Sequence, residues 1–210
     1  MRILLLTTIL LLTWVPQPDR TVHFDRWTPP DDMELDRDTF LSYLITEGLS
    51  WIRSQREILR PTAATVPDDY RERYALYFRP ETLDKTRYQL VDKIENPGFY
   101  DELTEKGMDI PLDFSKMDGI TFVDTIAVTR HKLRNPDLNR LLFHECVHVA
   151  QYEYLGMESF VSQYVHGWAE NGFDYFAIPL EEQAYELERR FARGETFSVE
   201  DVVAATFDQS

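Results

Sequence analysis

The segment NPDLNRLLFHECVHVAQYEYLG, residues 135–156, constrains the fold of this chain more than any other. Apolar residues dominate it, yet it also carries two histidines and a glutamate, His144, Glu145 and His148. Its apolar content predicts a largely buried helix. Burying ionisable side chains is unfavourable unless they are paired or bind something. The segment therefore predicts an interior site with chemistry of its own.

On a helix, His144 and His148 lie about 40° apart and project side by side, as two imidazoles that share one zinc ion must. Glu145 lies about 100° from His144, where a carboxylate can act as general base toward a metal-activated water. Cys146 points about 200° away, so we interpret it as a core residue. Gln151 returns to the side of the histidines, where it can contact a ligand or the substrate.

Two histidines leave a zinc site incomplete, because protein zinc sites that catalyse reactions have three protein ligands. The extended metzincin pattern requires a glycine and a histidine where this chain has Gln151 and Tyr154, which excludes that class. The remaining candidates for a third ligand follow the motif in the chain: His166, Glu170, Asp174, Glu181, Glu182 and Glu188.

A last helix is predicted over residues 179–193. The direction of each side chain around this helix, relative to its apolar stripe, distinguishes between these candidates. Its apolar stripe consists of Leu180, Ala184, Leu187 and Phe191. Glu182 lies almost opposite the stripe, whereas Glu181 and Glu188 border it and can reach an interior metal. We therefore favour Glu181 as the third ligand, with Glu182 and His166 as the main alternatives.

Three stretches together resemble the gluzincin branch of zinc metallopeptidases and, over the longer run, a bacterial group of gluzincin-like sequences. They are GITFVDTIAV, FHECVHVAQYEYLG and IPLEEQAYE, within residues 119–190. The resemblance implies a zincin-like fold, one Zn²⁺ ion, and Glu181 as the glutamate ligand on a later helix. It also implies that the strand before the active helix pairs with an extended peptide substrate. Tyr185 departs from the pattern, because better-known gluzincins have an aspartate there.

The remaining patterns predict an α+β fold. Residues 1–18 have the apolar run of a signal peptide or N-terminal anchor, and residues 19–35 form an extended arm. Residues 36–210 are expected to form one domain, with a first helix over 36–59 and one long strand over 119–129. We accordingly expect an exported protein, periplasmic or secreted, that contacts a membrane only through an uncleaved N-terminus.

The formal net charge of −15 argues against nucleic acid as a partner, because phosphate binding needs a basic surface. The single cysteine excludes an intramolecular disulfide. No pattern in the sequence predicts an oligomeric state.

The working hypothesis is a zinc-dependent hydrolase of peptide bonds, with Glu145 as general base and a peptide or protein as substrate. Four residues are candidates for stabilising the developing oxyanion or for supporting a ligand: His166, Tyr164, Tyr175 and Tyr185. Two alternatives stay open. One is a secreted binding or assembly-associated module that holds zinc without proteolysis, and the other is a structural domain with a fortuitous motif.

Overall fold

The structure is a computed structural model, and it describes residues 37–108, 110–131 and 138–208. The predicted signal peptide, the extended arm and the start of the motif helix at Asn135 lie outside these residues. None of the helices in the described ranges combines the length and the apolar character that crossing a membrane requires.

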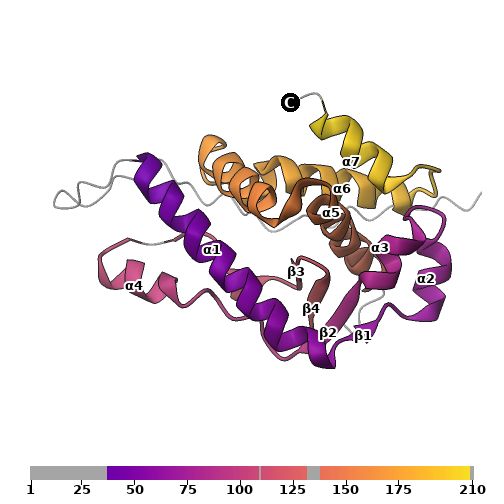
Figure 1. The fold of residues 1–210 in the computed structure, drawn as a ribbon, viewed down its shortest axis with the longest axis horizontal. Coiled ribbons are helices and arrows are strands. Elements are labelled where there is room, and N and C mark those ends of the chain that lie inside the picture. The colour runs from indigo at the N-terminus through magenta and orange to yellow at the C-terminus, as the bar shows by residue number, and fades with distance from the viewer. Residues whose placement is uncertain (1–36, 109, 132–137, 209–210) are drawn as a thin grey trace, which may run out of the picture.

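Seven α-helices and four strands make up the described chain, which confirms the α+β class (Figure 1). The helices are α1 Arg37–Leu59, α2 Asp68–Tyr74, α3 Pro80–Lys85, α4 Phe99–Glu105, α5 Leu138–Glu170, α6 Pro179–Ala192 and α7 Val199–Phe207. The strands are β1 Ala64–Thr65, β2 Arg87–Val91, β3 Gly119–Phe122 and β4 Thr125–Thr129.

The strands form one mixed sheet in the order β1-β2-β4-β3, with β2 parallel to β4 and the other two pairs antiparallel. All five residues of β4 are buried, as expected for a strand covered on both faces. Ile126 and Val128 pack into the core with the first half of α5, whereas Ala127 joins the core that includes α1. The sheet therefore lies between α1 and α5 (Figure 1).

The single strand predicted over 119–129 is wrong, because β3 and β4 form a hairpin with Val123 and Asp124 in its turn. The register pairs Thr121 with Ile126, so odd positions of β3 share a face with even positions of β4. Thr121 thus faces α5, whereas a continuous strand would have placed it on the other face from Ile126. Asp124 occupies the second position of this turn.

The helix of the motif does not end at Gly156 but is interrupted there. Gly156 has φ +75°, a value that glycine adopts readily, and the chain then continues as a helix to Glu170. This second half carries aromatic residues to which we had assigned no element. Helix α7 was also not predicted, and residues 70–78 form part of α2 and the turn after it.

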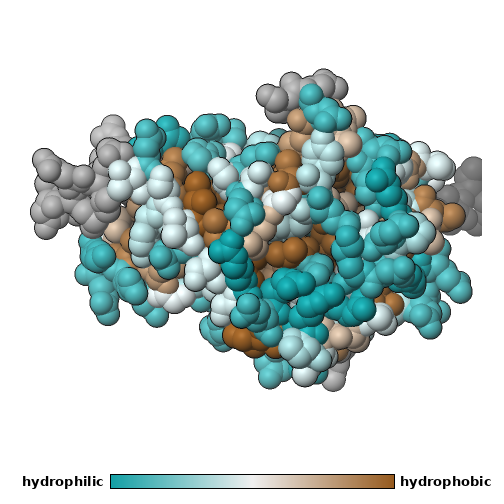
Figure 2. Space-filling view, viewed as in Figure 1, coloured by the Kyte–Doolittle hydropathy of each residue, from teal (hydrophilic) through white to brown (hydrophobic). Residues whose placement is uncertain are grey.

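The face of the molecule seen in Figure 2 is mainly hydrophilic, with apolar side chains visible in the space between α1 and the second half of α5. Beneath this space lies the larger apolar core, which joins α1 to α4, β3 and α5. A second core joins the first half of α5 to α2, α3, α6 and α7. The motif residues of α5 lie where the two cores meet.

Candidate metal centre

His144 and His148 of α5 and Glu181 of α6 meet in the interior, each about 5% exposed or less. The Nε2 atoms of the two histidines are 3.1 Å apart. Glu181 Oε2 lies 3.3 Å from the first and 3.5 Å from the second. Three donor atoms thus form a nearly equilateral triangle that could hold a metal ion. The same Oε2 atom is buried without a hydrogen-bond partner, as expected of an oxygen left to bind a cation.

The packing of α6 on α5 brings Glu181 to the histidines. Leu180, Ala184 and Leu187 are buried against α5 and fix the rotation of α6 about its axis. This rotation turns Glu181 inward and leaves Glu182 exposed. Glu181 therefore reaches the metal centre because it borders the apolar stripe, whereas Glu182 lies on the exposed side of the helix.

Gln151 fixes the ring of His148. Its Oε1 lies 2.8 Å from His148 Nδ1, and its amide nitrogen donates to the carbonyl of Leu180 and to Gln183. Because the amide oxygen can only accept, His148 carries its proton on Nδ1. Its Nε2 lone pair is then free to face Glu181, the arrangement that a metal ligand needs.

The other two candidate ligands also have supporting side chains. Tyr164 donates a 2.9 Å hydrogen bond to Glu181 Oε1, the oxygen that does not face the histidines. Glu188 Oε2 lies 3.5 Å from His144 Nδ1, and Arg140 pairs with Glu188 at 2.7 Å.

Tyr185 stands where gluzincins have an aspartate, and it packs its ring on His144 with centroids 4.4 Å apart. A carboxylate does lie beside His144, but it belongs to Glu188, one turn further along α6. Sequence reasoning considered Glu188 only as a third ligand and missed Arg140. The signal for both was available, since Glu188 borders the apolar stripe and Arg140 precedes His144 by one turn.

The histidines and carboxylates of the centre are complementary in charge. Burial favours the neutral form of His144, but the carboxylates of Glu181 and Glu188 outweigh it and raise its pKa to about 10. Burial likewise opposes ionisation of Glu181, but His148 and His144 outweigh it and lower its pKa. The centre thus holds negative charge that a cation can neutralise in place of a proton.

Glu145 lies beside the triangle, against β3. Thr121 donates to its Oε2 at 2.7 Å and also contacts its carbonyl oxygen. Burial raises the pKa of this carboxyl, which makes it a better proton acceptor than an exposed glutamate. A β-carbon on Gly119 would lie 2.7 Å from Glu145 Oε1, so any side chain at this strand position would displace the carboxylate. Neither Gly119 nor Thr121 was recognised from the sequence as part of the site.

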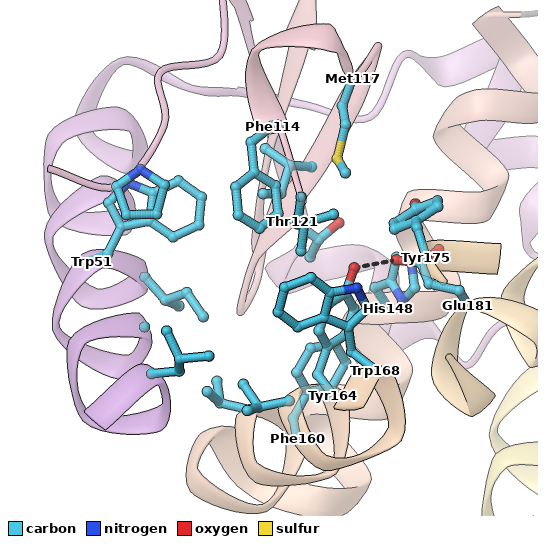
Figure 3. A pocket seen from close by; sticks show the side chains of 18 of the residues that line it. Trp51, Phe114, Met117, Thr121, His148, Phe160, Tyr164, Trp168, Tyr175 and Glu181 are labelled. Atoms are coloured by element: carbon cyan, nitrogen blue, oxygen red, sulfur yellow. Dashed lines mark hydrogen bonds and ion pairs between the residues drawn. The ribbon is translucent and has the colours of Figure 1, made fainter. Parts of the chain in front are cut away.

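Two cavities meet at Glu145. An apolar pocket of about 110 Å³ extends toward α1 and also contacts His148 and Glu181 (Figure 3). A wider cleft of about 710 Å³ lies on the other side and is lined by His144, Tyr185 and several charged residues. Tyr175, in the short 3-10 helix η4 Tyr175–Ala177, lines both.

Other candidates lie away from the centre. His166 is exposed on α5, with its Nδ1 near the carbonyl of Ser162, and Glu170 is exposed at the end of the same helix. Asp174 is exposed and caps η4. Cys146 is buried in the core on the far side of α5, consistent with a packing role.

Comparisons of the chain with protein-family models, with curated proteins and with solved structures found no match.

Proposed function

We propose that the protein is a zinc-dependent peptidase of the gluzincin type with a zincin-like fold. The observation that carries this proposal is the triangle of His144, His148 and Glu181, with edges of 3.1, 3.3 and 3.5 Å. Zinc bound tetrahedrally at about 2.0–2.1 Å separates its ligand atoms by about 3.3–3.4 Å. Two imidazoles and one carboxylate are also a ligand set of catalytic zinc sites, which keep a fourth position open.

A zinc ion in this set would acidify a water molecule and polarise the carbonyl of the substrate. Glu145 is placed to take the proton of a water that attacks the carbonyl carbon and to return it to the amine nitrogen released when the peptide C–N bond breaks. Its burial raises its pKa, which makes it a better proton acceptor than an exposed glutamate. Thr121 and the absence of a side chain at Gly119 fix its position.

A peptide substrate is supported by the position of β3. Within the sheet of the described residues, β3 is an edge strand that pairs only with β4. Its residues Gly119, Ile120 and Thr121 line the apolar pocket beside Glu145. An extended peptide could add to this edge by main-chain hydrogen bonds and so bring a peptide bond to the centre.

We assign the oxyanion donor to Tyr175. Tyr164 donates to the carboxylate of Glu181, whereas Tyr185 is packed on His144 and accepts a hydrogen bond from the neutral hydroxyl of Tyr175. Tyr175 lines both cavities, and burial raises its pKa well above the usual value, so its hydroxyl keeps its proton. A positioned donor of this kind stabilises the charge that develops on the carbonyl oxygen.

The experiment measures zinc per chain by elemental mass spectrometry and cleavage of a peptide library by the full-length protein. We expect one zinc ion per chain and metal-dependent cleavage. Glu181→Gln should lose zinc, whereas Glu182→Gln, the matched control one residue away, should keep it. Zinc without cleavage of any peptide would contradict the peptidase assignment and favour a zinc-binding module without proteolysis. Zinc lost only with Glu182→Gln would contradict the ligand assignment.

A further inference from the structure

The apolar pocket beside the metal centre has walls from several parts of the chain. Helix α1 contributes Leu44, Gly48, Trp51 and Ile52, and the segment before β3 contributes Phe114 and Met117. The second half of α5 contributes Phe160, Tyr164 and Trp168, and α4 with the segments beside it contributes Pro97, Phe99, Tyr100, Ile110 and Leu112. Figure 3 shows Trp51 on the α1 side of this space and His148, Glu181 and Tyr175 on the opposite side.

The chemistry of the walls changes from one end of the pocket to the other. Apart from its tyrosines, the ionisable residues that line it are Glu145, His148 and Glu181, all at the metal end. The α1 end is aromatic and aliphatic, with Trp51 packed on Phe114 and Phe122 at centroid distances of 4.9 and 5.2 Å. A ligand that fills the pocket must therefore be apolar, with a polar group where it reaches the metal centre.

The size of the pocket limits the occupant to one side chain. Its volume of about 110 Å³ is somewhat below the roughly 150 Å³ of an apolar protein cavity that binds benzene. A branched aliphatic side chain fits this volume, whereas a long acyl chain does not. The metal end, bordered by edge strand β3, is where the peptide bond next to that side chain would lie.

We propose that this pocket binds one leucine-sized apolar side chain of the substrate, next to the cleaved bond, and that helix α1 thereby sets the specificity of the enzyme. The proposal rests on the peptidase function proposed above. The α1 wall lies outside residues 119–190, to which the gluzincin resemblance extends, so that resemblance does not imply it.

Gly48 offers a way to fill the pocket without touching the metal centre. It lies within α1, and a β-carbon there would meet Val161 Cγ1 at 3.6 Å, an ordinary contact. Gly48→Leu should therefore fold, since leucine also favours a helix more than glycine does. Ser50→Leu is the matched control, because Ser50 is exposed on the same helix and does not line the pocket.

The experiment compares kcat/KM for peptides that differ only in having leucine or glycine beside the cleaved bond. Burying a leucine side chain corresponds to a preference of about 10- to 100-fold, which we expect for the wild type and for Ser50→Leu. Gly48→Leu should reduce the preference to near one, with zinc content and thermal unfolding as checks of its fold. Trp51→Ala widens the pocket. A third peptide, with tryptophan in place of the leucine, should therefore gain in kcat/KM relative to the leucine peptide in this variant.

Equal cleavage of both peptides by the wild type, or an unchanged preference in Gly48→Leu, would overturn the pocket assignment while leaving the peptidase function standing. If no peptide is cleaved, binding of leucinamide and glycinamide to the full-length protein is followed by the change in its tryptophan fluorescence, since two of its four tryptophans, Trp51 and Trp168, line the pocket. If the wild type binds leucinamide more tightly than glycinamide and Gly48→Leu does not, the pocket binds a leucine side chain even though the peptidase proposal has failed. Equal binding of the two amides, or stronger binding of decanoate than of leucinamide, would overturn it.

Discussion

Each candidate ligand is held by a side chain that does not itself point into the triangle. Gln151 holds His148, Tyr164 holds Glu181, and Glu188 lies against His144. Supporting groups of this kind orient a ligand and raise its basicity, so that their loss weakens metal binding although the ligand remains.

Glu188→Gln tests this at His144. The change removes the charge beside His144 Nδ1 and the ion pair with Arg140 but keeps the size of the side chain. We expect zinc affinity to fall by about 10- to 100-fold, measured by competition with a chelator. Glu186→Gln, an exposed position on the same helix, is the control and should bind zinc as the wild type does. Equal affinities in the two variants would show that Glu188 does not support the ligand.

Gly119→Ala tests the position of the general base. The added β-carbon would lie 2.7 Å from Glu145 Oε1, so the carboxylate must move away from Thr121. A displaced base typically loses its contribution of about 10²- to 10⁴-fold to the rate. We therefore expect kcat to fall by at least about tenfold with zinc content unchanged. Gly98→Ala is the control, because nothing lies within 4 Å of its added carbon; full activity in Gly119→Ala would contradict the placement of Glu145.

Much of the centre could be predicted because helical geometry relates residues that are close in sequence. The four-residue spacing of His144 and His148 and the apolar stripe of α6 were sufficient to predict that both histidines and Glu181 point inward. Gly119 and Thr121 could not be found in this way, because their contact with Glu145 depends on which face of β3 packs on α5. If β3 and β4 formed one continuous strand, as predicted, Thr121 would lie on the face opposite to the one that packs on α5.

At the scale of elements, the β3–β4 hairpin is fastened to α1 through Asp124. Arg56 donates two hydrogen bonds to this carboxylate, at 2.7 and 2.9 Å, and Arg60 lies 2.9 Å from it. The turn needs such an anchor, since Val123 has φ +62°, a strained conformation for a β-branched residue. The anchor positions β3, and with it the groups that hold Glu145.

Asp124→Asn should lower the free energy of unfolding at neutral pH, and this loss should become smaller at low pH. Burial opposes ionisation of Asp124, but the hydrogen bonds and charge of Arg56, together with Arg60, outweigh it and lower its pKa. The ionised carboxylate therefore stabilises the fold above the unfolded pKa of about 4, and this contribution is lost as the pH falls below it. We expect the variant to lose about 1–3 kcal/mol of unfolding free energy at pH 7.

The measurement is urea denaturation at pH 7 and at successively lower pH. The difference between wild type and Asp124→Asn should shrink as the pH falls below about 4. A difference that stays constant over this range would show that the charge of Asp124 contributes nothing to the fold.

The elements that were predicted wrongly share a physical cause. A two-residue hairpin turn usually carries glycine or asparagine, and Val123-Asp124 gives no such signal. Gly156 carries the signal for the end of a helix and does interrupt one, but packing of the aromatic residues after it restores the helix. Tertiary contacts, with Arg56 and Arg60 in the first case, override the local pattern.

At the scale of the whole molecule, the metal centre joins α5 to α6, and these two helices make the most extensive contact between any two elements described. A metal ion bound there would stabilise the folded state, because the unfolded chain does not hold its three ligands together. The order of the predicted elements and the periodicity of apolar residues were sufficient to predict the α+β class. The strand order β1-β2-β4-β3 was not predictable, since it depends on contacts between distant segments.

Zinc should accordingly raise the thermal unfolding temperature of the metal-free protein. Zinc at about 100 times its Kd adds about 2.7 kcal/mol, which corresponds to an increase of about 5–10 °C for a chain of this size. The increase is measured by differential scanning calorimetry and should be reversed by a chelator. Glu182→Gln should keep it and Glu181→Gln should lose most of it; an equal increase in both would place the metal elsewhere.

The most direct test of the central claim is the kcat/KM of Glu145→Gln against that of the wild type, at equal zinc content and on the same peptide. Glu145 is assigned the proton transfer and no share in holding the metal. We predict one zinc ion per chain in both proteins and a loss of activity of at least about 10²-fold in the variant. Activity equal to that of the wild type, with zinc bound in both, would contradict it.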